Sequence, residues 1–426
     1  MGRRRERRLL VAALGVGLAG PVLVAVVNGA TFAPQPGLSI PRVAAVWLQM
    51  ALAVTVCHAV LARRRSDADP LLLPLSVALC GLGLTIVFSL SPTQAQKQVN
   101  WLFAGLALVL AATSGLGDLT RLGRYAYLWG VATVVLLVIP MLFAREINGA
   151  RLWLEIGGLR FQPGELAKVT LVLFCAAYLA SARGELLTEE PRYVGGLALP
   201  DPRYLGPLAL MWLLGMALLV VLRDLGTAAL FFGTFVCLLY AASANSGYVA
   251  VGGLSFAGGA WLAQGLFPHV HRRLEAWLNP WSDKVIADAG YQVTQALFAI
   301  AAGGVTGVGL GLNHMQRVPA ATTDLPFAAL CEETGLWGAT LVLLLYALWV
   351  QRALRIAVRQ RERFTALLAA GLGCLMALQV LVIVGGVTKL IPLTGITLPF
   401  VSYGGSSLLT NCLMLGLLLR CSEGAQ

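Results

Sequence analysis

Long apolar runs without alternation dominate the chain, and short polar connections separate them. A helix needs about 20 apolar residues to cross a bilayer, whereas the strands of a lipid-facing barrel alternate apolar and polar positions. The runs therefore predict an all-α, polytopic membrane protein. We expect spans at about residues 9–28, 43–62, 71–90, 100–114, 126–143, 164–182, 207–222, 225–243, 247–267, 325–350, 364–388 and 402–420.

The composition agrees with a protein that resides in lipid, because 58% of the 426 residues are hydrophobic and 12% are charged. The net charge of +11 belongs to the connections, so we expect membrane lipids and no nucleic acid as partners. Most Lys and Arg fall on the side that carries both termini, which predicts cytoplasmic termini. The first run is too long for a signal peptide core, so we predict an uncleaved helix.

The longest polar connections lie on the outer face in this arrangement. They are residues 145–163 and the large loop at 268–324, with a further broken stretch at 389–405 that is rich in Pro and Gly. Irregular backbone at membrane depth is buried in protein or lines a wet cavity, so this stretch is a candidate cavity wall. The eight cysteines stand singly and predict no disulfide framework.

A group of charges marks the start of the span at 164–182. Pro163 at a helix start places Glu165 in the first turn and Lys168 in the next turn. An ionisable group within an apolar span usually has a function, which favours a functional Lys168. For Arg151, interfacial anchoring with a snorkelling side chain is the alternative.

Asp324 is the second candidate, at the mouth of the span at 325–350. A carboxylate there is suited to act as a general base toward a sugar hydroxyl. Helix capping explains it equally well, because Thr322, Thr323 and Asp324 are all good N-cap residues before Pro326.

Two weaker patterns are assigned no chemistry. His269 and His271 have the spacing of a metal-ligand pair but no third ligand in register, which favours a solvated loop. The glycines from 303 to 311 lack the Lys-Ser/Thr of a P-loop and do not support nucleotide binding.

Taken together, six segments resemble the SEDS family (shape, elongation, division and sporulation). They are Asn148-Gly149-Ala150-Arg151-Leu152-Trp153-Leu154, Phe161-Gln162-Pro163-Gly164-Glu165-Leu166-Ala167-Lys168, Arg223-Asp224-Leu225-Gly226-Thr227, Gly290-Tyr291-Gln292 with Gln295, residues 324–335, and residues 392–407.

The resemblance implies a ten-helix membrane domain at residues 71–420. Residues 1–70 then hold a cytoplasmic tip and two additional helices, and residues 421–426 form a cytoplasmic tail. Where the family has Pro-Glu-Ala-His-Thr-Asp-Phe, this chain has Pro319-Ala320-Ala321-Thr322-Thr323-Asp324-Leu325, which keeps the acid but loses a Glu and a His. The family's Glu-Glu-Leu-Gly is here Glu332-Glu333-Thr334-Gly335.

The implied function is a peptidoglycan glycosyltransferase that polymerises lipid II by inverting transfer on the outer face, in elongation or division. The resemblance makes Asp324 the catalytic residue and assigns substrate binding to Arg151, Arg160, Gln162, Glu165, Lys168, Asp224, Gln292, Glu332, Glu333, Lys389, Ser402 and Tyr403. The implied partners are lipid II, polyprenyl pyrophosphate and a class B penicillin-binding protein.

The inferred chemistry leaves three points open. Cations facing Asp324 across one cavity, or a divalent cation such as Mg²⁺ or Mn²⁺, would stabilise the leaving pyrophosphate. A lipid II flippase would use the same cationic cavity without a base. A scaffold for the penicillin-binding protein would need no buried charges.

Overall fold

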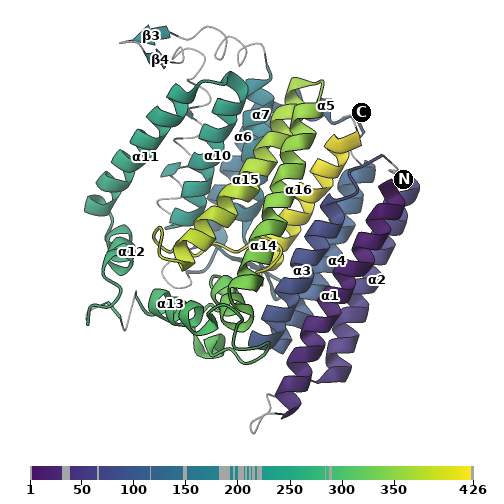
Figure 1. The fold of residues 1–426 in the computed structure, drawn as a ribbon. Coiled ribbons are helices and arrows are strands. Elements are labelled where there is room, and N and C mark those ends of the chain that lie inside the picture. The colour runs from purple at the N-terminus through teal and green to yellow at the C-terminus, as the bar shows by residue number, and fades with distance from the viewer. Residues whose placement is uncertain are drawn as a thin grey trace. The chain divides into compact units, whose positions relative to one another are not determined.

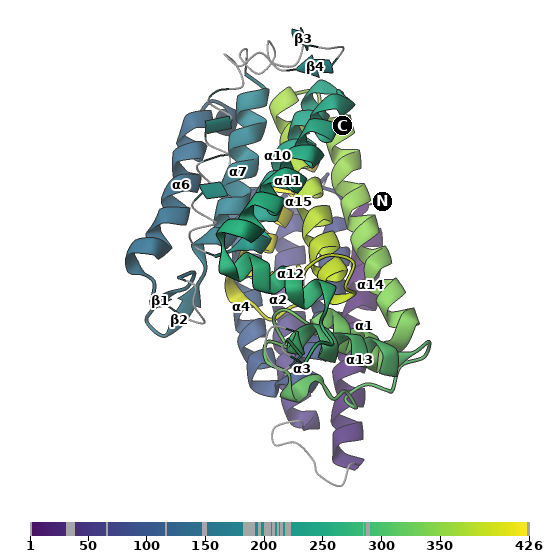
Figure 2. The same cartoon turned by 90° about the vertical axis from the view of Figure 1, so that its left-hand side faces the viewer.

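The computed structural model describes residues 2–30, 39–64, 67–115, 117–146, 151–181, 192–194, 197–199, 223–283, 285–286 and 290–423, and isolated residues between 206 and 217. Within these ranges the protein is built from helices, with two small antiparallel hairpins (Figures 1 and 2). The predicted span at 207–222 lies largely outside the described residues, as does the Asn148-Gly149-Ala150 motif.

The first helices are α1 (Gly2–Ala30), α2 (Ile40–Arg64), α3 (Leu72–Leu90), α4 (Pro92–Gly115), α5 (Thr120–Gly123), α6 (Ala126–Phe143) and α7 (Pro163–Leu179). They are followed by α10 (Leu225–Ser243), α11 (Ser246–Leu266), α12 (Pro268–Leu278), α13 (Tyr291–Gly303), the 3₁₀ turn η1 (Met315–Arg317), α14 (Pro326–Arg359), α15 (Arg363–Val387) and α16 (Gly405–Glu423). Strand β1 (Leu154–Ile156) pairs with β2 (Leu159–Phe161), and β3 (Arg192–Val194) with β4 (Leu197–Leu199).

Among the described residues, ten helices are long and apolar enough to cross a membrane: α1, α2, α3, α4, α6, α10, α11, α14, α15 and α16. The predicted all-α membrane fold is confirmed. Helix α7 forms where a span was expected but has 17 residues. Each of the eight cysteines is described and is free.

Two boundaries differ from the sequence-based prediction. Helix α4 begins at Pro92, not near residue 100, because its polar first turns are helical and the buried Gln98 finds hydrogen-bond partners inside the protein. The large connection at 268–324 contains α12, α13 and η1, and is therefore largely ordered structure.

The chain divides into two compact units. The first comprises Met1–Gly115, Arg272–Arg352 and Gln379–Leu419, and the second comprises Leu116–His271, Ala353–Leu378 and Arg420–Gln426. Helices α14 and α15 each contribute residues to both units.

In the first unit, the N-terminal helices pack closely on the following pair (Figure 1). Helix α1 lies along α3, and α2 contacts both α1 and α4. A Cβ on Gly81 would lie 2.9 Å from the Cα of Gly17, and a Cβ on Gly20 would lie 2.5 Å from Oγ1 of Thr85. Small residues at these crossings let the two backbones approach, as they commonly do between membrane helices.

In the second unit, α6 packs along α7, and α7 also contacts α10 (Figure 2). Oγ1 of Thr133 donates to Oγ1 of Thr170 across the α6–α7 interface at 2.9 Å. The β1–β2 hairpin directly precedes α7 and leads the chain into its first turn.

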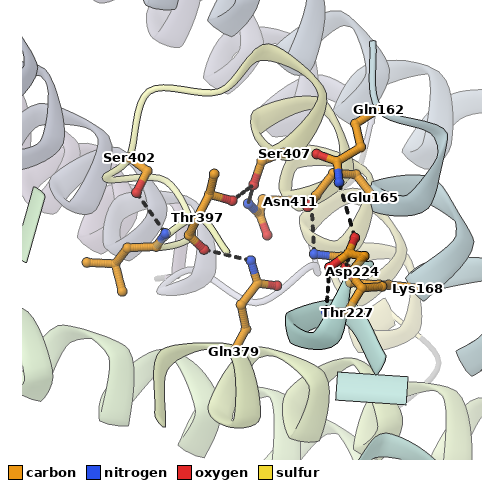
Figure 3. Close-up of polar contacts among 11 residues, drawn as sticks. Gln162, Glu165, Lys168, Asp224, Thr227, Gln379, Thr397, Ser402, Ser407 and Asn411 are labelled. Atoms are coloured by element: carbon orange, nitrogen blue, oxygen red, sulfur yellow. Dashed lines mark hydrogen bonds and ion pairs between the residues drawn. The ribbon is translucent and has the colours of Figure 1, made fainter. Parts of the chain in front are cut away.

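The predicted break between the last two helices is present, and its backbone is buried in protein. Residues 388–404 form no helix, yet Leu398, Val401 and Ser402 are at most 4% exposed. Side chains complete the hydrogen bonds of this segment: Gln379 donates to the Thr397 carbonyl at 2.8 Å (Figure 3), Gln98 to the Ser402 carbonyl at 2.9 Å, and Tyr346 to the Pro399 carbonyl. These bonds satisfy carbonyl groups that lipid could not.

Helix α14 is interrupted at Gly335, where φ is 63° and ψ is −160°. The glycine loop, residues 303–311, joins α14 at this break. The amides of Val308 and Gly309 donate to the carbonyls of Glu332 and Glu333, and the amides of Leu336 and Trp337 donate to the carbonyls of Gly304 and Val305. A Cβ on Gly307 would lie 2.2 Å from the Glu333 carbonyl oxygen, so the glycines in the loop have a structural role.

Candidate functional site

Asp324 lies at the end of a tight turn just before α14. The amides of Thr323 and Asp324 both donate to the Ala320 carbonyl, and Ala320 itself has φ of 59°. Because α14 begins at Pro326, its N-cap position is Leu325. The capping explanation therefore fails for Asp324, and its carboxylate is left for another role.

The surroundings of Asp324 favour its neutral form. Desolvation raises its pKa from 3.8 to about 6, while a hydrogen bond with Thr323 and the charge of Arg273 act in the opposite direction. The side chain is nevertheless half-buried, so it keeps access to the outside of the protein. A carboxylate with this pKa is ionised at neutral pH and remains able to accept a proton.

Arg273 is a candidate site residue that the sequence did not reveal. It lies on α12, and its Nη1 donates to the Thr394 carbonyl at 2.8 Å. The next residue, Gly395, has φ of 72°, and a Cβ there would lie 3.5 Å from Oδ2 of Asp324. Arg273 thus fixes the turn that passes beside the acid and also acts electrostatically on it.

Six predicted binding residues lie in the same unit as Asp324, and four of them lie outside α14. Gln292 donates to the Pro319 carbonyl at 3.2 Å and supports the turn before the acid. The Tyr403 amide donates to the Thr322 carbonyl at 2.8 Å. The Ser402 hydroxyl accepts from the Leu398 amide, and the Lys389 carbonyl accepts from Trp277 of α12. These bonds are structural, and substrate binding by these residues stays a prediction.

The second unit contains a buried ion pair at the start of α7 (Figure 3). As expected, Glu165 lies in the first turn, and its Oε2 is 2.8 Å from Nζ of Lys168, with side chains 6% and 1% exposed. Gln162 precedes the helix and donates to Oδ2 of Asp224 at 3.5 Å.

Asp224 has a clear structural role as the N-cap of α10. Its Oδ1 accepts from the Thr227 amide at 3.0 Å, and its Oδ2 accepts from the Thr227 hydroxyl at 2.8 Å. The bond from Gln162 therefore ties the N-terminus of α7 to that of α10, which brings two positive helix ends together.

Arg151 and Arg160 lie before and on the β1–β2 hairpin. Arg160 pairs with Glu155 at 2.9 Å and Arg151 with Glu146 at 3.7 Å, and both arginine side chains are more than half exposed. Exposed pairs of this kind contribute about 0–1 kcal/mol, so an anionic ligand can displace the acid at little cost.

The paired acids Glu332 and Glu333 are buried in the first unit, each 1% exposed. Oε1 of Glu332 accepts from the amide of His314 at 3.1 Å, and Oε1 of Glu333 accepts from the hydroxyl of Ser89 at 2.6 Å and from Asn313. They hold the loop that follows α13 against α3 and α14. His269 and His271, considered above as metal ligands, lie on α12.

The structure thus gathers the predicted residues into two groups. Asp324, Gln292, Tyr403 and the newly found Arg273 surround one turn of the first unit. Gln162, Glu165, Lys168 and Asp224 surround the helix ends of the second. The first group can accept a proton, whereas in the second the cation Lys168 is paired with Glu165 and Asp224 caps α10. A single cavity shared by Asp324 and the cations stays a prediction.

Comparisons with known proteins point to one family. A family model for cell cycle proteins of the FtsW, RodA and SpoVE type matches residues 70–426. The peptidoglycan glycosyltransferase RodA of Mycobacterium tuberculosis (strain ATCC 25618 / H37Rv) is 40% identical over 382 residues, covering 87% of this chain and 81% of that protein. The probable peptidoglycan glycosyltransferase FtsW of Nitrosococcus halophilus (strain Nc4) is 34% identical over 374 residues, covering 83% and 91%.

A solved structure shares the fold. It was described as showing structural coordination of polymerization and crosslinking by a peptidoglycan synthase complex. One of its chains matches with a TM-score of 0.68 and 27% sequence identity, covering 84% of this chain and 98% of that chain.

Proposed function

This chain belongs to the FtsW/RodA/SpoVE family of cell cycle proteins, the SEDS family, and we propose that it polymerises lipid II into glycan strands on the outer face of the bacterial plasma membrane. It is a multi-pass membrane protein and a peptidoglycan glycosyltransferase. The observation that carries the proposed mechanism is Asp324, a half-buried carboxylate with a raised pKa beside Arg273.

Asp324 serves as the general base in a single inverting displacement. It takes the proton from the acceptor sugar hydroxyl as that oxygen forms a bond to the anomeric carbon of the donor. The bond from this carbon to the pyrophosphate oxygen breaks, and polyprenyl pyrophosphate leaves. With a pKa of about 6, roughly nine in ten molecules are ionised at pH 7 and ready to accept the proton.

Arg273 positions the base. Its hydrogen bond to the Thr394 carbonyl holds the turn at Gly395 beside the carboxylate, and its charge keeps the pKa of Asp324 from rising further. Both effects keep the carboxylate ionised in a fixed orientation, which a proton acceptor needs before the acceptor sugar arrives.

The positive groups of the second unit bind the pyrophosphate. Arg151 and Arg160 are exposed and only weakly held by acids, and bidentate contacts from arginine suit phosphate oxygens. Lys168 acts from within α7, where its pair with Glu165 fixes the helix start and its amide groups. Lys389 adds a further charge, and a divalent cation such as Mg²⁺ or Mn²⁺ would assist the leaving group.

The orientation in the membrane follows from charge. Most Lys and Arg lie in connections on the side of the termini, so we place both termini in the cytoplasm and the Asp324 turn outside. On that face we expect a class B penicillin-binding protein to act with the enzyme, in cell elongation or division. The similar solved chain, taken from a peptidoglycan synthase complex, supports such a partnership.

The test is glycan synthesis from purified lipid II by the reconstituted protein, with and without its penicillin-binding partner. We expect long strands from the wild type and none from Asp324→Asn that is folded and still binds the partner. Glu275→Gln is the matched control, because Glu275 is an exposed acid on α12 in the same unit and should leave synthesis unchanged.

Two results would contradict the proposal. Equal synthesis by wild type and Asp324→Asn would remove Asp324 as the base. No synthesis by the wild type with its partner, while labelled lipid II crosses the vesicle membrane, would replace polymerisation with transport.

A further inference from the structure

Two cysteines meet between α10 and α15 in the second unit, where these helices lie side by side (Figures 1 and 2). The thiols of Cys237 on α10 and Cys374 on α15 are joined by a hydrogen bond. All eight cysteines of the chain are described, and these two are half-buried whereas the other six are buried. The pair therefore holds the most accessible thiols of the chain, and the proposed mechanism does not use them.

The packing on either side of the pair independently brings the two cysteines to the same level. A Cβ on Gly233 of α10 would lie 2.9 Å from Cδ1 of Leu378. A Cβ on Gly371 of α15 would lie 3.0 Å from Cδ2 of Leu238. Positions rise along α10 as they fall along α15, so the two helices run antiparallel. One helical turn from the Gly233–Leu378 contact, on the same face of each helix, stands one cysteine of the pair.

The interface is narrow enough for a covalent bond between the two sulfurs. Gly233 and Gly371 have no side chains that could hold the backbones apart. A disulfide needs Cα atoms about 4.4–6.8 Å apart, which helices reach only where they approach closely. Because the sulfurs are already hydrogen-bonded to each other, forming the bond requires little movement of either helix.

The pair faces lipid rather than water. Both helices are long and apolar enough to cross a membrane, and each cysteine lies more than one turn from the helix ends. Tyr240, on the same face of α10 as Cys237, is 47% exposed, and Leu378, one turn from Cys374, is half-buried. Charged reagents enter hydrocarbon only at a high cost, so a reagent that reaches these thiols has to dissolve in the bilayer.

We propose that Cys237 and Cys374 form a reversible oxidation site for lipid-soluble organic hydroperoxides. One thiol sulfur attacks a peroxide oxygen, the O–O bond breaks, and the alcohol leaves while the cysteine becomes a sulfenic acid. The second thiol attacks the sulfenic sulfur, water leaves, and the S–S bond forms. Two electrons pass from the thiols to the peroxide, and the two thiol protons end in the alcohol and the water.

The disulfide joins α10 to α15, so this inference goes beyond the proposed polymerisation. Helix α10 begins at its cap, Asp224, whose carboxylate accepts a hydrogen bond from Gln162. In the reduced protein, packing and a thiol hydrogen bond hold the two helices at this level, whereas in the oxidised protein a covalent bond holds them. Oxidation therefore fixes the helix that Asp224 caps without adding a group to the protein.

The test uses the full chain in vesicles of saturated phosphatidylcholine, treated with cumene hydroperoxide, which dissolves in lipid, or with oxidised glutathione, which does not. The protein is then unfolded, and its free thiols are counted with a maleimide. We expect cumene hydroperoxide to lower the count from eight to six and dithiothreitol to restore it. Peptide mass spectrometry should place the bond between Cys237 and Cys374, and oxidised glutathione should leave all eight thiols free.

Single variants separate the pair from the other cysteines. Cys237→Ser and Cys374→Ser should form no disulfide, and dimedone should instead label the remaining cysteine of the pair as a sulfenic acid. Cys175→Ala is the matched control, because it removes a buried thiol of the same unit and should still lose two thiols.

Three results would overturn the proposal. Cumene hydroperoxide could leave all eight thiols of the wild type free, the bond could join other cysteines, or oxidised glutathione could form the bond as readily. The first two would remove the site, and the third would show that the pair is reached from water. No readout uses lipid II, so failure here is separate from failure of the polymerase proposal.

Discussion

Asp324→Asn should stabilise the protein while it abolishes polymerisation. Folding raises the pKa of this carboxyl from 3.8 to about 6, so between these values the folded state binds more protons than the unfolded state. Stability from this group is therefore lost as pH rises through that range. At 1.36 kcal/mol per pKa unit, the ionised carboxylate costs at most about 3 kcal/mol at pH 7.5. Asparagine removes the charge, and we expect a gain of about 1–3 kcal/mol.

The assay is thermal unfolding of both proteins in the same detergent at pH 7.5 and pH 5. At pH 7.5 the variant should melt higher by on the order of a few degrees. At pH 5 the wild-type carboxyl is about nine-tenths protonated, so the difference should shrink. Glu275→Gln should show no difference at either pH. A variant that is equally or less stable at pH 7.5 would refute the argument, because Asp324 would then carry no desolvation cost.

Three further changes test the surroundings of the site. Arg273→Gln should move the acid limb of the polymerisation rate up by as much as about 1 pH unit, because the charge of Arg273 holds the pKa of Asp324 down and its loss raises that pKa. An unmoved limb, equal to that of the exposed control Arg272→Gln, would exclude the charge effect. Gly307→Ala should lower the free energy of unfolding by about 3 kcal/mol, because φ is 81° and the new Cβ would lie 2.2 Å from the Glu333 carbonyl oxygen. A variant that melts at the wild-type temperature would show that the loop can move away from α14. Lys168→Met leaves Glu165 buried without its ion-pair partner and should lower the free energy of unfolding by about 3–5 kcal/mol. Adding Glu165→Gln should restore most of this stability, and equal instability of the single and double variants would contradict the argument.

Hydrophobic patterning predicted most of the fold, because each membrane span is an apolar run that can be recognised without knowledge of tertiary contacts. It failed where polar residues are buried. The predicted span at 100–114 left the first turns of α4 in a connection, yet Gln98 in those turns bonds to the Ser402 carbonyl and the Gly404 amide. Those partners lie more than 300 positions away in the chain, and no local pattern encodes them.

The site was predictable only in part. Pro163 before Glu165 and Lys168 indicated a helix start with charges in its first turns, and the structure confirms that placement. The choice between base and cap for Asp324 depended on a helix boundary, which a sequence locates only to within a few residues.

Arg273 was missed for a different reason. Its hydrogen bond joins residues 121 positions apart, and its neighbour Arg272 has the same local sequence context. The one available signal was the amphipathic pattern of residues 268–278, which predicts a helix but not which cation turns inward.

The break in α14 has a consequence for how the protein enters the membrane. Beyond Gly335, residues 336–359 form a helix about 36 Å long, which is enough to cross the bilayer without the preceding residues. Glu332 and Glu333 then never have to enter hydrocarbon, where each charge would cost several kcal/mol. The glycine loop is synthesised before α14 and can bond to the carbonyls of both acids as soon as the inserted helix has formed. Insertion of residues 336–359 into lipid and burial of Glu332 and Glu333 within the protein are therefore separate steps.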